Sequence, residues 1–358
     1  MPILNRSKIR PDVLKLADQL QKRQMKLIPK FLSQKENQGI NFPSLWKKVQ
    51  EGNERFFKAK NEEEVEELFN LLTDDEVLFL AKMLRFAFEE SANIDQKENP
   101  ISKDVQIEKI DIGGIPAEWQ TVPDAIKENI LLYFHGGGMI MGSPNSQRLL
   151  TVALGQALKM RILSVDYRLA PEYPFPAGLE DCVAAYKWLL STGVKPENII
   201  IAGDSAGGYY TLTTLIKLRD HGIKLPAGAF CLAPTTDFST LDEEFLQNGE
   251  TDPILADIGL FWWIPTYAGD ADLNNPLISP ALADLKNLPP ILIQVSKIEM
   301  LYSHAKKFYE RAKEAGVDIT LQTWDDMVHV FQGFGLNILP EAKEAIEKIR
   351  QFSQKILN

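Results

Sequence analysis

The sequence predicts an α/β protein with a mainly parallel β-sheet that helices cover on both faces. After residue 129, six apolar runs of strand length are separated mostly by stretches with apolar residues at helical spacing. The runs are ILLYF (130–134), RILSVDY (161–167), NIIIAG (198–203), AGAFCLA (227–233), PILIQV (290–295) and ITLQTW (319–324). Buried strands that alternate with helices indicate a doubly covered parallel sheet. Right-handed crossovers would place the carboxyl ends of the strands at one edge, where ligands usually bind.

The N-terminal part of the chain, residues 1–98, is predicted to be a helical region of its own. It contains four stretches with helical spacing and none typical of a strand, and Thr73 with the acids after it forms a capped helix start. The first stretch carries leucines among many lysines, which fits either a membrane-surface helix or a helix packed over a neighbouring domain. We favour packing. Residues 91–103 are predicted to be a linker with a breaker at Asn99-Pro100.

Two segments directly after this linker alternate apolar and polar residues. They read VQIEKIDIGG and IPAEWQTV. Alternation with a period of two is typical of strands with one solvated face. The two segments are therefore expected to form an antiparallel pair at the edge where the sheet begins.

The composition limits the class of ligand and the compartment. A formal net charge of -10 disfavours binding to nucleic acid, which needs dense Lys and Arg, and favours a neutral small molecule. Cys182 and Cys231 each lie in an apolar run and are expected to be buried free thiols, as suits a reducing cytoplasm. The first residues lack an apolar leader, and no later run of about 18 apolar residues exists. We therefore expect a cytoplasmic protein without a membrane span.

The motif G-x-S-x-G at Gly203–Gly207 is the main functional signal. A β-branched run ends at Gly203, Ser205 follows, and helical spacing resumes at Tyr209. A strand, a sharp turn and a helix in this order hold a serine hydroxyl clear of the backbone, as a nucleophile elbow does. Side chains in place of the two glycines would collide with the adjoining strand and helix. A glycine-rich helix entry with an incidental serine is the alternative, and the motifs below make it less favoured.

Three glycines, Gly136–Gly138, follow His135 at the end of the first apolar run. Unobstructed backbone N–H groups at such a place are suited to stabilise a developing negative charge. We predict Gly136, Gly137 and Ala206 as the donors of an oxyanion hole. A phosphate loop would need G-K-[ST] after the glycines, and a dinucleotide site would need G-x-G-x-x-G, so both are disfavoured. His135 is expected to fix the loop by hydrogen bonding rather than to act as a base.

Four motifs in this order resemble the hormone-sensitive-lipase-like bacterial esterases of the α/β-hydrolase superfamily. They are HGGG (135–138), YRLAPEYPFPAGLED (167–181), GDSAGG (203–208) and WDDMVHVF (324–331). The resemblance covers roughly residues 100–358 and implies an eight-stranded α/β-hydrolase fold in a catalytic domain of residues 99–358. It also implies a helical cap, built from residues 1–98 and an insertion at about 236–275. Within the second motif, Arg168 and Glu172 are expected to form a structural ion pair.

The same resemblance completes a catalytic triad around Ser205. A serine hydroxyl needs a base to take its proton, and the base needs an acid to hold its tautomer. His329 matches the family motif and follows the last apolar run, whereas His221 and His304 lie in helical stretches. Relatives place an aspartate or, in some members, a glutamate after the strand PILIQV, and the only candidate of that kind here is Glu299. A solvated glutamate at a helix start is the alternative reading of this residue.

Other acids and the aromatic insertion carry weaker predictions. Asp325 and Asp326 are close to His329 in sequence, but they follow the wrong strand to orient it. An aromatic cluster in the insertion could line a substrate pocket or pack the insertion onto the N-terminal helices, and core packing is the more common role. Its members are Phe261, Trp262, Trp263 and Tyr267. We name no specificity residue.

These residues predict a serine carboxylesterase that hydrolyses short- to medium-chain esters through an acyl-enzyme, with no metal or organic cofactor. The same triad would serve an amidase or a lactone hydrolase, and sequence does not separate them. A ligand-binding receptor on the same fold is less favoured because His329 and the rest of the machinery are present. A zinc hydrolase is disfavoured since the chain lacks H-E-x-x-H and clustered His and Cys. The expected partner is a small-molecule ester, and a homodimer is possible.

Overall fold

An eight-stranded, mostly parallel sheet forms the centre of the computed structural model, which describes residues 4–59, 61–256, 259–334 and 339–357. The strands lie in the order β1-β2-β4-β3-β5-β6-β7-β8. Their bounds are β1 (Gln106–Asp111), β2 (Pro116–Thr121), β3 (Ile126–Phe134), β4 (Met160–Val165), β5 (Ile199–Asp204), β6 (Gly228–Leu232), β7 (Ile291–Ser296) and β8 (Ile319–Trp324). β2 pairs antiparallel with both β1 and β4, and every later pair is parallel. The predicted antiparallel pair at the edge is confirmed.

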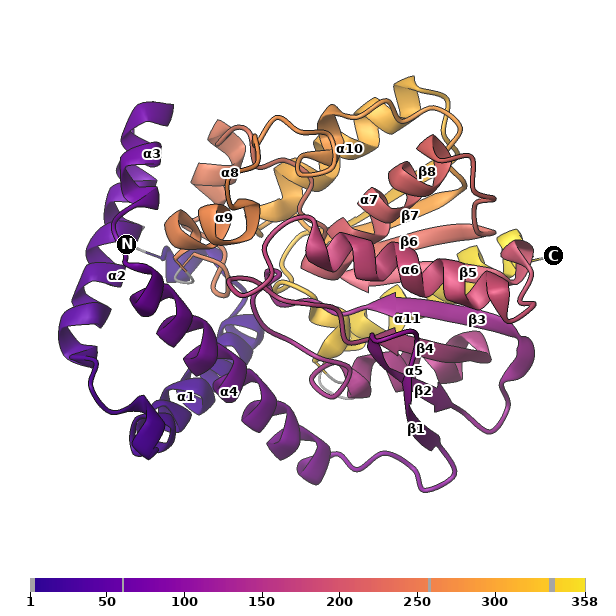
Figure 1. The fold of residues 1–358 in the computed structure, drawn as a ribbon, viewed down its shortest axis with the longest axis horizontal. Coiled ribbons are helices and arrows are strands. Elements are labelled where there is room, and N and C mark those ends of the chain that lie inside the picture. The colour runs from indigo at the N-terminus through magenta and orange to yellow at the C-terminus, as the bar shows by residue number, and fades with distance from the viewer. Residues whose placement is uncertain (1–3, 60, 257–258, 335–338, 358) are drawn as a thin grey trace.

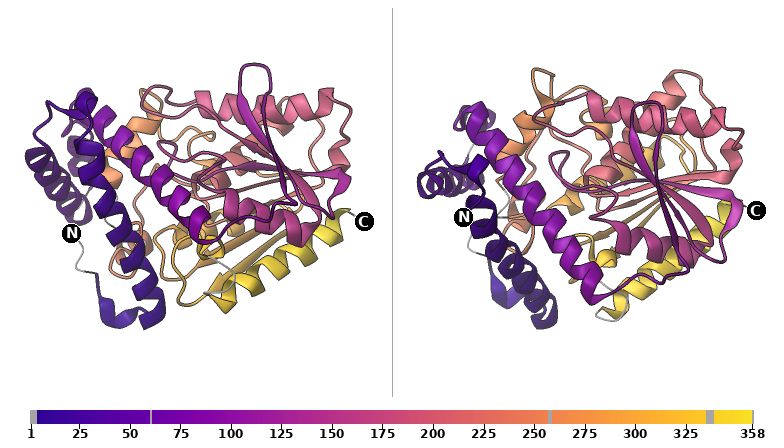
Figure 2. Two further views of the ribbon diagram at one scale, coloured as in Figure 1. Left: turned by 90° about the horizontal axis from the view of Figure 1, so that it is seen from below. Right: turned by 60° about the horizontal axis from the view of Figure 1, so that its bottom comes forward.

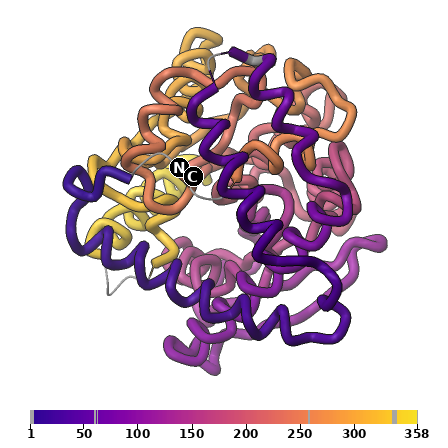
Figure 3. Tube along the Cα trace, turned by 90° about the vertical axis from the view of Figure 1, so that its left-hand side faces the viewer, coloured from indigo at the N-terminus to yellow at the C-terminus, as the bar shows by residue number. Residues whose placement is uncertain are grey.

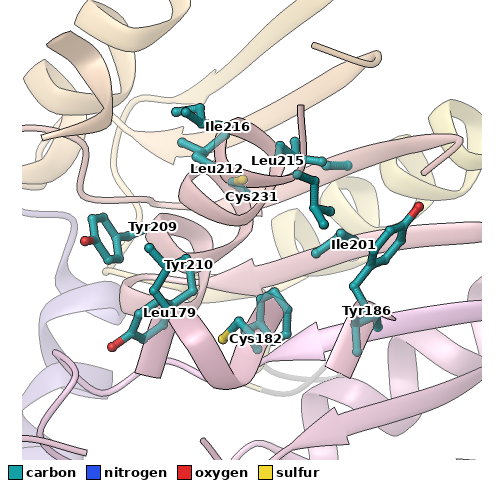
Figure 4. Packing of buried hydrophobic residues seen from close by; sticks show 14 of the residues in the cluster. Leu179, Cys182, Tyr186, Ile201, Tyr209, Tyr210, Leu212, Leu215, Ile216 and Cys231 are labelled. Carbon is teal, nitrogen blue, oxygen red and sulfur yellow. The ribbon is translucent and has the colours of Figure 1, made fainter. Parts of the chain in front are cut away.

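Helices cover both faces of this sheet, as the alternation of apolar runs and helical stretches predicts (Figure 1). One face packs against α6 (Ala177–Ser191), α7 (Ala206–Asp220) and α10 (Leu301–Glu314). The other face packs against α5 (Arg148–Leu158) and α11 (Pro340–Leu357). Figure 4 shows the first of these cores, where Cys182 and Cys231 lie among aliphatic and tyrosine side chains. Both cysteines are buried and free, as predicted.

The N-terminal residues form four α-helices at the end of the sheet where its parallel strands terminate. They are α1 (Pro11–Leu32), α2 (Phe42–Lys58), α3 (Glu62–Phe69) and α4 (Asp74–Glu98), and α4 begins with the predicted capping box at Thr73. Short 3₁₀ helices are η1 (Arg6–Lys8), η2 (Lys35–Asn37), η3 (Pro196–Asn198), η4 (Pro280–Leu282) and η5 (Phe331–Gly333). Among the residues described, none of the helices combines the length and apolarity that a membrane crossing requires.

The predicted linker at residues 91–103 is wrong in its first part, because α4 continues to Glu98. Two side chains in this part are buried, Ser91 and Ala92. Further along, Arg23 of α1 forms an ion pair with Asp95, and Gln96 donates to the Asn145 carbonyl at 3.0 Å. These tertiary contacts extend the helix through a stretch whose polar composition is typical of a linker.

A second hydrophobic core joins the N-terminal helices to the segment between β6 and β7. That segment contains α8 (Glu243–Asn248) and α9 (Leu260–Ala268), and its aromatic residues pack with Phe56 and Phe79 from the N-terminal helices. In Figure 3, which faces this layer, the indigo N-terminal helices lie beside the orange segment. We call α1–α4, α8 and α9 the helical layer. Its division from the sheet domain at residue 98, and its role as a cap, stay predictions.

The beginning of the chain packs on the loop after β8. Ile9, Val13 and Ala17 form a cluster with Met327, Val328 and Phe331, on either side of position 329. Val13 is fully buried there, and the Asn5 amide donates to the Glu250 carbonyl at 2.7 Å. Residues 4–17 therefore contact both the loop after β8 and the turn that follows α8.

Replacing Val13 with Asp should release residues 4–17 from this loop, because an unpaired carboxylate would stand in an apolar cluster, at a cost of roughly 3–5 kcal/mol. Amide hydrogen exchange in peptides covering residues 324–334 should become faster. Gln19→Asp places the same charge on an exposed position of α1 and is the matched control. Equal exchange rates in the two variants would contradict the packing described here.

Candidate active site

Ser205 lies on a sharp turn between the end of β5 and the start of α7. Its backbone has φ 52° and ψ -117°, a positive φ that a residue with a side chain rarely adopts. The flanking glycines permit this turn: a Cβ at Gly207 would lie 1.9 Å from the Phe134 carbonyl oxygen, and one at Gly203 would lie 2.3 Å from the Gly207 carbonyl carbon. Ser205 is partly exposed, whereas its neighbours Asp204 and Ala206 are buried. The hydroxyl is therefore carried at the carboxyl edge of the sheet on a strained but tightly packed turn.

Glu299 and His329 form a buried acid–base pair beyond two neighbouring strands. Glu299 follows β7, His329 follows β8, and Glu299 Oε2 lies 2.5 Å from His329 Nδ1. The other carboxylate oxygen of Glu299 accepts the Ser296 amide at 2.7 Å. The side chain of Glu299 is only 1% exposed and that of His329 only 8%, so Glu299 is not a solvated glutamate. Burial alone would lower the pKa of His329, but the hydrogen bond and charge of Glu299 outweigh it, and the net pKa is raised above 6.5.

Two further carboxylates, Asp204 and Asp252, lie close enough to His329 to contribute to this raised pKa. Burial raises the pKa of each of them to about 6. Asp252 is fully buried, and its Oδ2 accepts the amide of Met300, the residue after Glu299, at 2.9 Å. Asp252 was not predicted as part of the site, since nothing in the sequence distinguishes it from the other acids of the insertion.

The charge of Asp204 reaches His329, but Ser205, the next residue, has no hydrogen bond to the histidine. Within the described part of the chain, no hydrogen bond joins the Ser205 hydroxyl to the His329 imidazole. Asp204, the residue before Ser205, nevertheless acts on His329 through its charge. Serine–histidine contacts of this kind are often long without substrate and tighten when substrate binds. The imidazole presents Nδ1 to Glu299, so Nε2 is the nitrogen left to receive a proton.

The glycine loop after β3 fits the predicted oxyanion hole only in part. The Gly136 amide donates to Asp204 Oδ1 at 3.0 Å, and a Cβ at Gly136 would lie 2.1 Å from Asp204 Oδ2. Gly136 therefore does not fit the predicted role as a donor, because its N–H already has a buried anionic acceptor. In contrast, the N–H groups of Gly137 and Gly138 have no acceptor among the described residues, and neither does that of Ala206 at the first position of α7.

His135 fixes this loop, as predicted. Its Nδ1 lies 2.8 Å from the Gly136 carbonyl oxygen, and its ring stacks on Tyr167 with centroids 4.1 Å apart. Tyr167 in turn donates its hydroxyl proton to the His135 carbonyl at 2.5 Å. Full burial lowers the pKa of His135 to about 4, so the ring is neutral near pH 7. The two other histidines lie outside the site: His221 ends α7, and His304 lies in α10.

The predicted ion pair between Arg168 and Glu172 is wrong. Arg168 binds Asp181, with Nη2 2.7 Å from Asp181 Oδ1, whereas Glu172 binds Arg85 of α4 at 2.7 Å. Asp181 lies in α6, where its buried carboxylate also accepts the Arg168 amide at 2.9 Å. Glu172 and Asp181 thus each bind an arginine, but the pairing depends on tertiary contacts that sequence spacing does not reveal.

The remaining predicted residues lie as follows. Asp325 is exposed and pairs with Lys297 at 2.6 Å, away from the acid–base pair. Phe261, Trp262 and Trp263 are buried in the core that joins the insertion to the N-terminal helices, whereas Tyr267 is buried in the core of the sheet domain. Trp263 also reaches the glycine loop, because a Cβ at Gly138 would lie 1.8 Å from its ring. Across the described residues, no group of three His, Cys, Asp or Glu side chains is arranged to hold a metal ion.

Known proteins with similar sequences and structures were compared with this chain. The family model described as alpha/beta hydrolase fold matches residues 131–333. An acetyl-hydrolase of Streptomyces hygroscopicus is 39% identical over 238 residues, which make up 66% of this chain and 79% of that protein. An esterase of Acinetobacter venetianus is 33% identical over 258 residues, or 72% of this chain and 84% of that protein.

Two solved structures extend the likeness to nearly the whole chain. An esterase from the bacterial hormone-sensitive lipase family superposes with a TM-score of 0.71 at 39% identity, covering 88% of this chain and 99% of that chain. EstE5 soaked with p-nitrophenyl butyrate superposes with a TM-score of 0.72 at 36% identity, with the same coverage of 88% and 99%. On the strength of its eight-stranded sheet, its serine turn and these matches, the chain belongs to the α/β-hydrolase family, among the esterases that resemble hormone-sensitive lipase.

Proposed function

We propose that the protein is a serine carboxylesterase that works through an acyl-enzyme, with Ser205, His329 and Glu299 as its triad. The buried contact of 2.5 Å between Glu299 and His329 carries this proposal, together with the positive-φ turn at Ser205. A carboxylate on Nδ1 fixes the tautomer that leaves Nε2 free to act as a base. The triad order of serine, acid and histidine along the chain is also the order that α/β-hydrolases use.

In the first half of the reaction, Ser205 Oγ attacks the ester carbonyl carbon and its proton moves to His329 Nε2. Glu299 stabilises the imidazolium that results. The tetrahedral intermediate collapses, its bond to the alkoxide breaks, and His329 Nε2 protonates the departing alcohol. In the second half, water gives its proton to His329 and attacks the acyl carbon, so that the acid leaves and Ser205 regains its proton. No metal or organic cofactor takes part in these steps.

The negative charge on the former carbonyl oxygen needs donors that are already in place. We propose the N–H groups of Gly137, Gly138 and Ala206, in place of the predicted set with Gly136. Two observations support this choice: these three amides have no acceptor among the described residues, and Gly136 donates to Asp204. Gly137 has φ +124° and Gly138 has φ +58°, conformations that glycine adopts more readily than residues with a side chain.

We propose neutral short- to medium-chain esters as substrates, with the helical layer as a cap over the site. The related acetyl-hydrolase and the related EstE5, which was soaked with p-nitrophenyl butyrate, support small acyl groups. The acidic net charge of -10 also favours neutral over anionic substrates. An amidase or lactone hydrolase would use the same residues, and no contact in the structure favours either of them over the ester.

Ser205→Ala should abolish turnover of p-nitrophenyl esters from acetate to palmitate, with kcat at least about 10⁴-fold lower, because no nucleophile remains. The unaltered protein should give a burst of nitrophenol on its best substrates and then a slower steady rate. Ser191→Ala, at the exposed end of α6, is the matched control and should behave like the unaltered protein. Retained turnover in Ser205→Ala would exclude the proposed mechanism.

Glu299→Gln should lower kcat about 10³- to 10⁴-fold with the fold intact, since the imidazolium loses its partner. Asp325→Asn removes an exposed carboxylate on the loop that carries His329 and should leave kcat within about two-fold. Near-normal turnover of Glu299→Gln would exclude Glu299 as the acid. A large loss of kcat in Asp325→Asn would instead indicate that the acid follows β8 rather than β7.

The pH profile of kcat/KM should fall on the acid side as His329 gains a proton, since only the neutral imidazole can act as base. Because the folded protein raises the pKa of His329 above 6.5, half of the activity should be lost at a pH above that value. In Glu299→Gln the raising charge is gone, so the midpoint of the acid limb should move to lower pH. A midpoint that does not change between the two proteins would contradict the assignment of the pair.

A further inference from the structure

Arg85 of α4 binds two loops of the sheet domain with one guanidinium group. Its Nε donates to the Ile140 carbonyl at 2.6 Å, and its Nη2 donates to the Ala170 carbonyl at 2.7 Å. Both Nη atoms also bind the carboxylate of Glu172, at 2.8 and 2.7 Å. The Arg85 side chain is 25% exposed, so these bonds are partly shielded from water. Figure 2 shows α4, in purple, between the indigo N-terminal helices and the sheet domain.

The Ile140 carbonyl belongs to the turn that follows the proposed oxyanion amides. Within this turn, the amides of Ile140 and Met141 donate to the Gly137 carbonyl at 3.1 and 3.0 Å. The turn is joined to the second loop because the Ala170 amide donates to the Met139 carbonyl at 2.9 Å. Arg85 therefore bridges, through its side chain, the same two loops that this backbone hydrogen bond joins.

A glycine-rich turn of this kind needs contacts from other parts of the protein to hold its N–H groups in fixed positions. Besides Gly137 and Gly138, Met139 and Gly142 have positive φ values, of 62° and 97°. Glycines give the unrestrained turn many conformations, and a residue such as Met139 at positive φ adds strain. Oxyanion stabilisation, however, depends on donors that are in position before the charge develops. A charge-assisted fork of hydrogen bonds is well suited to hold such a turn.

We propose that Arg85 is a positioning residue for the oxyanion hole, and that Glu172 is the counterion that holds Arg85 against the Ile140 and Ala170 carbonyls. The inference deepens the proposed function and rests on it. It also gives a role to Glu172 of the motif at residues 167–181, whose partner Arg85 comes from the N-terminal part of the chain. The helical layer would then contribute to transition-state stabilisation as well as to covering the site.

Removing this guanidinium should affect the transition state more than the bound substrate, because the negative oxygen exists only after attack. Arg85→Met keeps the apolar stem and removes the donors. Measured per active site by the nitrophenol burst, its kcat should fall about 10- to 100-fold, as small misplacements of catalytic groups do, while KM changes by less than about three-fold. Its affinity for an aryl trifluoromethyl ketone, which forms a tetrahedral adduct with Ser205, should weaken by about the same factor as kcat/KM.

Two further variants and one control complete the experiment. Arg85→Lys retains one point charge without the fork and should show an intermediate loss of kcat. Glu172→Gln keeps the guanidinium and removes its counterion, so its loss should be smaller and in the same direction. Lys97→Met, at an exposed position near the end of α4, is the matched control and should behave like the unaltered protein.

The inference is overturned if soluble Arg85→Met or Arg85→Lys has the kcat and ketone affinity of Lys97→Met. It is equally overturned if the variants lose only thermal stability, because that result would assign Arg85 a structural role alone. These outcomes can be separated from failure of the proposed function. That failure would appear as turnover without a burst in the unaltered protein, or as turnover that persists in Ser205→Ala.

Discussion

The buried hydrogen bond between Glu299 and His329 is the interaction on which the rest of the site depends. A polar pair with almost no exposure is stable only if neighbouring groups satisfy its remaining polar atoms. Neighbouring side chains support the backbone of the loop that carries Glu299. Asn248 donates to the Glu299 carbonyl at 2.9 Å, and Asp252 accepts the Met300 amide. The loop that carries His329 is supported by the N-terminal cluster around Val13. Segments from the insertion and from the N-terminal part of the chain thus hold one pair in place.

The serine turn and the glycine loop form a second unit, joined through Asp204. Its Oδ1 accepts the Tyr133 hydroxyl at 2.7 Å and the Gly136 amide at 3.0 Å, so the residue before Ser205 holds the start of the loop. Arg85 holds the other end of that loop through the Ile140 carbonyl. The proposed nucleophile and the proposed oxyanion donors are therefore connected through a short series of hydrogen bonds, and Arg85 of the helical layer is part of that series.

Much of the fold was predictable because its signals are local. Apolar runs predicted the parallel strands and the glycine spacing predicted the serine turn. Glu299 was expected as the acid from the resemblance to known esterases, and it lies 2.5 Å from His329 after β7. The errors concern contacts between distant residues. The extension of α4 beyond residue 91 depends on partners such as Arg23, the partner of Arg168 is Asp181, and the Gly136 amide is occupied by a side chain 68 positions away. The order of the strands in the sheet likewise could not be obtained from periodicity.

The most direct test of the central claim is to look for the acyl-enzyme itself. During turnover of p-nitrophenyl acetate, samples quenched in acid within the burst should contain protein that carries one acetyl group, as measured by intact-protein mass spectrometry. Peptide mapping should place the acetyl group on Ser205, and the adduct should disappear once substrate is exhausted. Turnover without any acetylated protein, or an acetyl group that maps to another residue, would contradict the proposed mechanism.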